Sequence, residues 1–249
     1  MSLISEEIVV NSTQELQGHF FASAEKNMPV VILVHGLPDS RSALGTFIST
    51  YLLLSERLTN DVSVNTLFVP FSGLNKTNSD FTIKNWVKDL SATIDYAHNR
   101  FPDSPILIVG FSLGGAIALK VAQDNILVKA CAVFGMTHSV DELLSPINLF
   151  VEALEKNGLG KPAPKEEFLG VIDVEKLLAA WPEKKPLLVG IGEDDEVVGL
   201  KNVQKVAKFV PSTQSLILYP FANHRLRYDP RVIASLVGWL GRMPVGESL

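Results

Sequence analysis

The sequence predicts an α/β protein built on a doubly wound, mostly parallel eight-stranded sheet. Short runs rich in Val and Ile, such as PVVILV at 29–34 and PILIV at 105–109, alternate with longer amphipathic segments. Several of these runs are almost continuously apolar, which is typical of parallel strands covered by helices on both faces. The length of 249 residues and the hydrophobic content of 47% fit one domain, which we expect to span 1–249.

The expected strands follow one another along the whole chain, at 4–10, 18–24, 29–34, 62–69, 105–109, 129–134, 186–191 and 215–219. We expect the first two to pair antiparallel, because no crossover helix fits between them. The expected helices are 43–57, 82–100, 113–123, 200–209 and 230–242. Pro230 suits the first turn of the last helix, with Asp229 as its N-cap. Repeated strand, helix and strand units require right-handed crossovers, which produce the doubly wound sheet.

One stretch, 136–182, interrupts this alternation. It contains no expected strand, only two amphipathic pieces at 145–156 and 165–180 around a segment rich in Gly and Pro. Its length exceeds what a crossover needs. We therefore expect a helical cap, inserted within the domain and lying over the carboxyl ends of the strands. Leu144 and Phe150 are its candidate substrate contacts, although such apolar residues can equally dock a cap on the core.

Composition excludes several classes of protein. A net charge of −5 and a sequence pI near 5.6 give no basic footprint for nucleic acid. The apolar stretches are too short for a membrane span, and acids stand where a signal peptide carries positive charge, so we expect a cytoplasmic protein, monomeric or homodimeric. Cys131 is the one cysteine, and the sequence has no H-E-x-x-H motif, so no protein-built metal site is expected.

The pentapeptide GFSLG at 110–114 is the strongest chemical signal. It directly follows the expected strand PILIV and directly precedes a helical run, the context in which G-x-S-x-G forms a nucleophile elbow. Small residues two before and two after the serine permit the tight, strained turn. Ser112 is therefore the candidate nucleophile, and the Leu113 N–H at the helix N-terminus is a candidate oxyanion donor.

A serine at its ordinary pKa is a weak nucleophile and needs a base. Of the five histidines, His224 comes just after the last expected strand, at the sheet edge where sites assemble. His138 is a weaker second candidate. His35 also ends a strand, but it precedes Gly36 in a loop with another expected task. The sequence favours His224 as the general base.

The third member of a triad is expected to be an acid after another strand end. The segment 193–196, EDDE, follows the strand at 186–191. We favour Asp195, which precedes a turn and an apolar pair, while Asp194 remains the alternative. The chain order is then Ser, Asp, His, as this architecture requires. A second oxyanion donor is expected from the loop after the strand at 29–34, where Gly36 permits a sharp turn and leaves the Leu37 N–H free.

Together these residues resemble the α/β-hydrolase superfamily of serine hydrolases, over nearly the whole chain and in the right order. The resemblance implies an ester or thioester substrate, an acyl-enzyme on Ser112 and no cofactor. The dehalogenases and epoxide hydrolases of the superfamily use an aspartate nucleophile, whereas this chain has Ser112 at that position. The superfamily also includes lyases and inactive members, so two alternatives stay open: an idle binding or regulatory protein, and a triad enzyme acting on C–C bonds.

Other residues are candidates for contact with the substrate. Phe111, beside the nucleophile, and Phe71, at the end of the strand at 62–69, could line the site, although Phe111 also suits packing between sheet and helix. Arg225 and Arg227 flank His224 and could bind an anionic group or pair with nearby acids.

Overall fold

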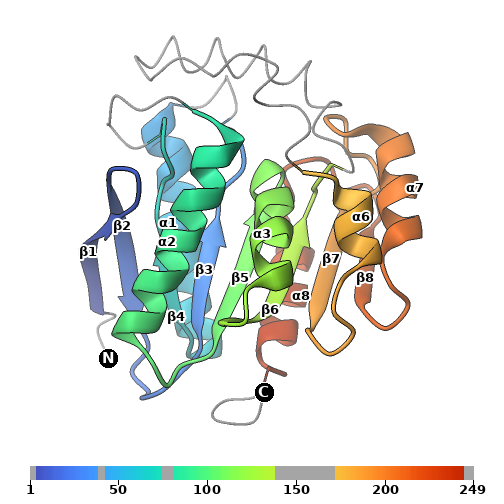
Figure 1. Cartoon of the computed structure of the whole chain (residues 1–249). Helices are drawn as coiled ribbons and strands as arrows, with labels where there is room; N and C mark the ends of the chain where they lie inside the picture. Colours follow the sequence, from blue (N-terminus) through green and yellow to red (C-terminus); the bar gives the residue numbers. More distant parts are fainter. Residues whose placement is uncertain (1–3, 39–42, 75–80, 138–171, 244–249) are drawn as a thin grey trace.

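The structure of the protein is a computed structural model that describes residues 4–38, 43–74, 81–137 and 172–243. These residues form an eight-stranded sheet in the order β1-β2-β4-β3-β5-β6-β7-β8 (Figure 1). The strands are β1 (Ile4–Asn11), β2 (Glu15–Ala22), β3 (Val30–Val34), β4 (Asn65–Phe68), β5 (Ile106–Phe111), β6 (Val128–Phe134), β7 (Leu187–Gly192) and β8 (Ser215–Tyr219). β2 pairs antiparallel with β1 and β4, and every other neighbouring pair is parallel. The predicted fold class is confirmed.

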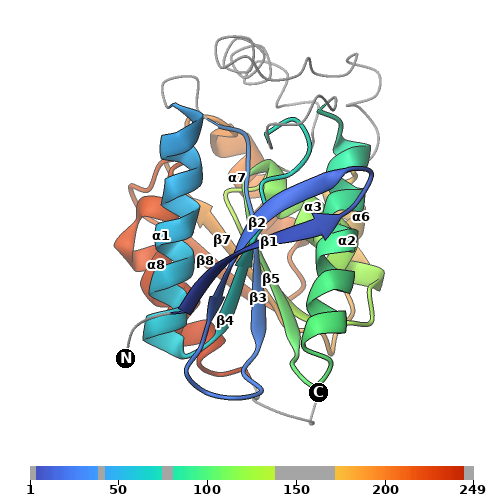
Figure 2. The same cartoon turned by 90° about the vertical axis from the view of Figure 1, so that its left-hand side faces the viewer.

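Helices cover both faces of the sheet. Figures 1 and 2 show α1 (Leu44–Val62) and α8 (Pro230–Leu240) on one face. The other face carries α2 (Ile83–Arg100), α3 (Leu113–Asp124) and α6 (Val174–Ala179), with α7 (Gly199–Phe209) against α6. The central strands β3, β5 and β7 are buried along their whole length, which explains their continuous apolar sequences.

The start of α8 has the capping predicted from the sequence, and two further helix ends are capped by side chains. Asp229 Oδ1 accepts a hydrogen bond of 2.9 Å from Arg231 N, and Pro230 opens α8. Thr82 caps α2 by accepting 2.9 Å from Asn85 N. At the C-terminal end of α3, the Lys185 ammonium donates to the carbonyls of Ala122, Gln123 and Asn125. A cation at this end also complements the helix dipole.

The boundary between α1 and β4 differs from the prediction. We expected a helix over 43–57 and a strand over 62–69, but α1 continues to Val62 and β4 begins only at Asn65. Leu54 and Leu58 lie one helical turn apart and are both buried, so packing holds the last turns helical despite the polar residues that follow. Ser63 ends the helix in the left-handed conformation, with φ of 55°.

The stretch expected to form a cap is described only at its two ends. Leu144 and Phe150 lie outside the described residues. At the carboxyl end, α6 is part of the helical layer on the sheet: Val174 and Leu178 are fully buried, and Gln123 Nε2 of α3 donates 3.0 Å to Leu177 O. The second expected helical piece, 165–180, therefore ends as a crossover helix between β6 and β7.

Candidate active site

The turn from β5 into α3 carries Ser112 in a strained conformation. Its φ of 54° and ψ of −128° are rare for any residue with a side chain. The Ser112 N–H donates 2.8 Å to Phe134 O on the neighbouring strand, so the turn is fixed to β6. This geometry places the hydroxyl at the N-terminus of α3, as expected of a nucleophile elbow.

The glycines around Ser112 are required by close backbone contacts. A Cβ on Gly110 would lie 2.6 Å from Gly114 O. A Cβ on Gly114 would lie 2.1 Å from His35 O, and one on Gly36 would lie 2.8 Å from Ser112 Cβ. The loop after β3 thus lies directly against the elbow, at a distance that any side chain would prevent.

The structure brings Ser112, His224 and Asp195 together. His224 Nε2 lies 2.9 Å from Ser112 Oγ, and His224 Nδ1 lies 3.0 and 2.9 Å from Asp195 Oδ1 and Oδ2. The Asp195 side chain is fully buried, while that of His224 is 17% exposed. A buried carboxylate beside Nδ1 favours the imidazole tautomer that carries its proton on Nδ1. Nε2 is then free to accept the serine proton.

Backbone groups of the β7–α7 loop hold Asp195 in place. Its Oδ1 accepts hydrogen bonds of 3.1 and 3.0 Å from Val197 N and Val198 N. Asp194, the alternative acid, is exposed, and its N–H donates to Ala222 O. Of the two acids, the one that contacts His224 is therefore Asp195.

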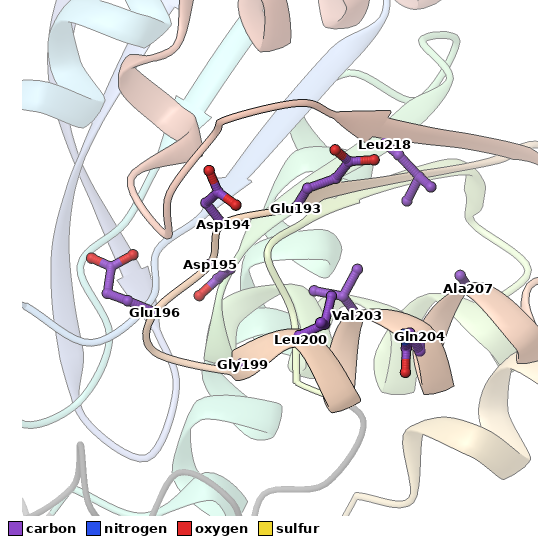
Figure 3. Close-up of a pocket in the computed structure, with 10 residues that line it drawn as sticks. All are labelled: Glu193, Asp194, Asp195, Glu196, Gly199, Leu200, Val203, Gln204, Ala207 and Leu218. Carbon is purple, nitrogen blue, oxygen red and sulfur yellow. The ribbon is translucent and has the colours of Figure 1, made fainter.

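The acidic loop also forms one side of a groove of about 810 Å³ (Figure 3). Apolar side chains of α7 and β8, among them Leu200, Val203 and Leu218, line the rest. Figure 3 shows the carboxylates of Glu193, Asp194 and Glu196 spread around the loop that also carries Asp195, which is itself one of the lining residues.

Sequence reasoning missed the role of Glu196. Its Oε2 accepts a hydrogen bond of 3.1 Å from His224 N and so ties the histidine loop to the acid loop. In the sequence Glu196 is one of four successive acids, and only the fold brings the backbone of His224 to this carboxylate.

The two backbone N–H groups predicted to bind an oxyanion lie on α3 and on the loop after β3. Leu113 is the first residue of α3, where an N–H group has no acceptor within the helix. On the facing loop, Gly36 N donates 3.2 Å to Tyr51 Oη, which leaves the next amide, Leu37 N–H, as the candidate of that loop. Leu37 is half-buried at this edge of the sheet.

His35 is buried beneath that loop. Its Nε2 accepts 2.9 Å from Phe71 N, and its Nδ1 lies 2.9 Å from Gly36 O. Burial lowers the pKa of His35 to about 4; the hydrogen bond to Gly36 opposes this shift and the charge of Arg227 adds to it. The imidazole is therefore neutral at pH 7, and because Nε2 is an acceptor, its proton is on Nδ1.

The remaining candidates occupy different environments. Phe111 is 4% exposed and stacks on Phe134, with ring centroids 5.4 Å apart. Phe71 is 1% exposed and packs against His35. The Arg227 guanidinium lies over the ring of Tyr51, 5.6 Å from its centroid, while Asp229 pairs with Arg231 instead.

Within the described ranges, no three His, Cys, Asp or Glu side chains gather closely enough to hold a metal ion. The same part of the chain holds no helix both long and apolar enough to cross a membrane.

Comparisons with known proteins agree with the fold of this chain. Residues 31–238 match the sequence model of a family described as the alpha/beta hydrolase family. The fold is similar to the esterase domain of a Rhodothermus marinus protein, with a TM-score of 0.67 and 20% identity over 96% of each chain. An esterase from Pyrococcus furiosus gives a TM-score of 0.70 at 18% identity, over 96% of this chain and 89% of that one. An alpha-beta serine hydrolase homologue from Coxiella burnetii gives 0.63 at 17% identity, over 95% and 96%. A comparison with curated proteins finds no match.

Proposed function

Because the chain belongs to the alpha/beta hydrolase family, we propose that it is a serine hydrolase that cleaves a carboxylic ester or thioester. The observation that carries this proposal is the hydrogen-bonded series Ser112 Oγ, His224 and buried Asp195. A carboxylate, an imidazole and a hydroxyl in this order activate serine as a nucleophile in unrelated folds.

The proposed reaction proceeds through an acyl-enzyme. Ser112 Oγ attacks the carbonyl carbon while His224 Nε2 takes the hydroxyl proton, and Asp195 stabilises the imidazolium. The carbonyl oxygen becomes an oxyanion, which Leu37 N–H and Leu113 N–H bind. His224 then returns the proton to the leaving alcohol or thiol as its bond to the acyl carbon breaks. Water then attacks the acyl carbon while His224 takes its proton. The bond from the acyl carbon to Ser112 Oγ breaks, His224 returns the proton to Oγ, and the acid is released.

Four apolar side chains are the proposed substrate contacts. Phe111 and Phe71 lie near the nucleophile and the oxyanion loop, and the expected cap contributes Leu144 and Phe150. This set is apolar and fits an acyl chain of small to medium size, and no cofactor takes part in the proposed reaction.

The substitution Ser112→Ala tests the proposal. Hydrolysis of p-nitrophenyl esters and of acyl thioesters should fall by about 10³–10⁶ in kcat, because only binding and oxyanion stabilisation remain. Ser49→Ala, at an exposed serine of α1, is the control and should keep full activity. Equal hydrolysis by wild type and Ser112→Ala would contradict the proposal, and a wild type that hydrolyses neither substrate would favour an idle binding protein.

A further inference from the structure

The loop that carries Leu37 is held from below through both polar groups of Gly36. Gly36 N–H donates 3.2 Å to Tyr51 Oη, and Gly36 O accepts 2.9 Å from His35 Nδ1. All three residues are buried or nearly so, and neither partner belongs to the triad.

The hydrogen bond from His35 is made to the peptide unit between Gly36 and Leu37, whose N–H is the proposed oxyanion donor. Gly36 C=O and Leu37 N–H belong to one planar trans peptide unit, so they point in opposite directions. Because His35 Nδ1 binds the Gly36 carbonyl, the Leu37 N–H points away from the buried His35 ring. A hydrogen bond on the carbonyl also polarises the unit and strengthens its N–H as a donor.

His35 can donate to the Gly36 carbonyl only when its proton is on Nδ1. The groups around the ring favour this tautomer. Phe71 N–H occupies Nε2 at 2.9 Å, so Nε2 carries no proton. Burial keeps the ring neutral, with its pKa near 4. The rings of Trp86 and Phe71 lie 4.6 and 5.1 Å from the imidazole centroid and fix its plane.

We propose that His35 and Tyr51 are positioning residues that orient the Gly36–Leu37 peptide for oxyanion binding. The inference rests on the proposed serine hydrolase function and adds to it. His35 touches no reacting atom and acts through Leu37, and Tyr51 acts through Gly36. Their contribution belongs to the transition state, where the oxyanion forms, and not to substrate binding.

Two substitutions at His35 separate its two hydrogen bonds. In His35→Asn the side-chain amide nitrogen can take the place of Nδ1 and donate to Gly36 O. In His35→Gln the amide oxygen can take the place of Nε2 and accept from Phe71 N–H, while the donor to Gly36 is lost. Both variants bury an amide of similar polarity, so a purely structural role predicts similar losses of activity.

The positioning role predicts different losses, measured with p-nitrophenyl esters. His35→Gln should lower kcat by about 10- to 100-fold, somewhat less than the removal of an oxyanion donor, with KM within about twofold. His35→Asn should stay within about threefold of wild type, and Tyr51→Phe should lower kcat by a smaller factor than His35→Gln. Thr59→Val is the control on the same helix as Tyr51. It removes a buried hydroxyl that lies 3.0 Å from Thr66 Oγ1, and it should leave kcat unchanged.

Several results would overturn the proposal. Equal kcat for His35→Asn and His35→Gln would reduce His35 to a packing role, provided that hydrolysis still depends on Ser112. If hydrolysis by the wild type does not depend on Ser112, the proposed function fails first and the positioning role fails with it. Should either variant not fold, ¹⁵N NMR of the wild type decides: we expect a neutral His35 with its proton on Nδ1, and a proton on Nε2 or a charged ring at pH 7 would contradict the role.

Discussion

Ser112 keeps a backbone conformation that costs about 1–3 kcal/mol of stability, and the turn around it is built to hold that conformation. The Ser112 N–H is bound to Phe134 O, and Gly110 and Gly114 allow the backbone to pass closely on both sides. At the scale of single residues the molecule thus loses stability at the position where the proposed chemistry needs an exposed hydroxyl.

The acids at 194 and 195 show what sequence could not decide at this scale. Adjacent side chains on a loop point in different directions, and only the packed fold buries one of them. Asp195→Asn should lower kcat by about 10²–10⁴, because the amide no longer stabilises imidazolium and favours the wrong tautomer. Asp194→Asn is the matched control, since Asp194 is exposed, and its kcat should stay within about threefold. A larger loss of kcat for ester hydrolysis in Asp194→Asn than in Asp195→Asn would contradict the assignment of Asp195.

At the scale of elements, the packing of α3 against the loop after β3 determines whether the site can form. Gly114→Ala places a Cβ 2.1 Å from His35 O, a contact that the backbone cannot relieve without moving the loop after β3. We expect the free energy of unfolding, measured by urea denaturation, to fall by about 3 kcal/mol or more, at the upper end of overpacking effects.

Gly45→Ala in α1 provides the comparison for this glycine. Apart from its chain neighbours and the backbone of its own helix, no atom of the described residues lies within 4 Å of a Cβ built there. Alanine in a helix is more favourable than glycine by about 0.5–1 kcal/mol, so stability should be unchanged or slightly higher. A tolerated Gly114→Ala would show that α3 and the loop after β3 are less closely packed than the structure indicates.

Sequence predicted the elements well where one signal dominates. The run SLILY gives β8 with the bounds expected, and Pro230 with Asp229 gives the start of α8. It was wrong over 58–64, because the burial of Leu58 against the sheet outweighs local preference. Contacts such as Glu196 with His224 join loops 28 residues apart, and no local pattern encodes them.

At the scale of the whole molecule, the parallel sheet gathers residues from distant parts of the chain at one edge. Gly36, Ser112, Asp195 and His224 follow β3, β5, β7 and β8, whose carboxyl ends lie at the same side. The order of strands thus converts a linear series of motifs into a compact site.

Burial of neutral His35 in this core makes the stability of the molecule depend on pH. The unfolded chain binds a proton on His35 near pH 6.5, but the folded chain only near pH 4. Between these values the unfolded state holds more protons, so stability falls as pH decreases from 6.5 to 4 and is fully present above 6.5. The separation corresponds to about 3 kcal/mol.

Denaturant unfolding at a series of pH values checks this expectation. His35→Asn should reduce the slope of the unfolding free energy against pH between 4 and 6.5 by up to about 1.4 kcal/mol per pH unit. Thr59→Val changes no titratable group and should keep the wild-type slope. An unaltered slope in His35→Asn would show that folding does not lower the pKa of His35.

The central claim is that Ser112 is a nucleophile activated by His224, and covalent labelling tests it most directly. The folded wild type should react with a fluorophosphonate, and mass spectrometry of its peptides should locate one adduct on Ser112. His224→Ala should slow the labelling by orders of magnitude while the fold is retained. An unlabelled wild type, or an adduct on another residue, would contradict the account.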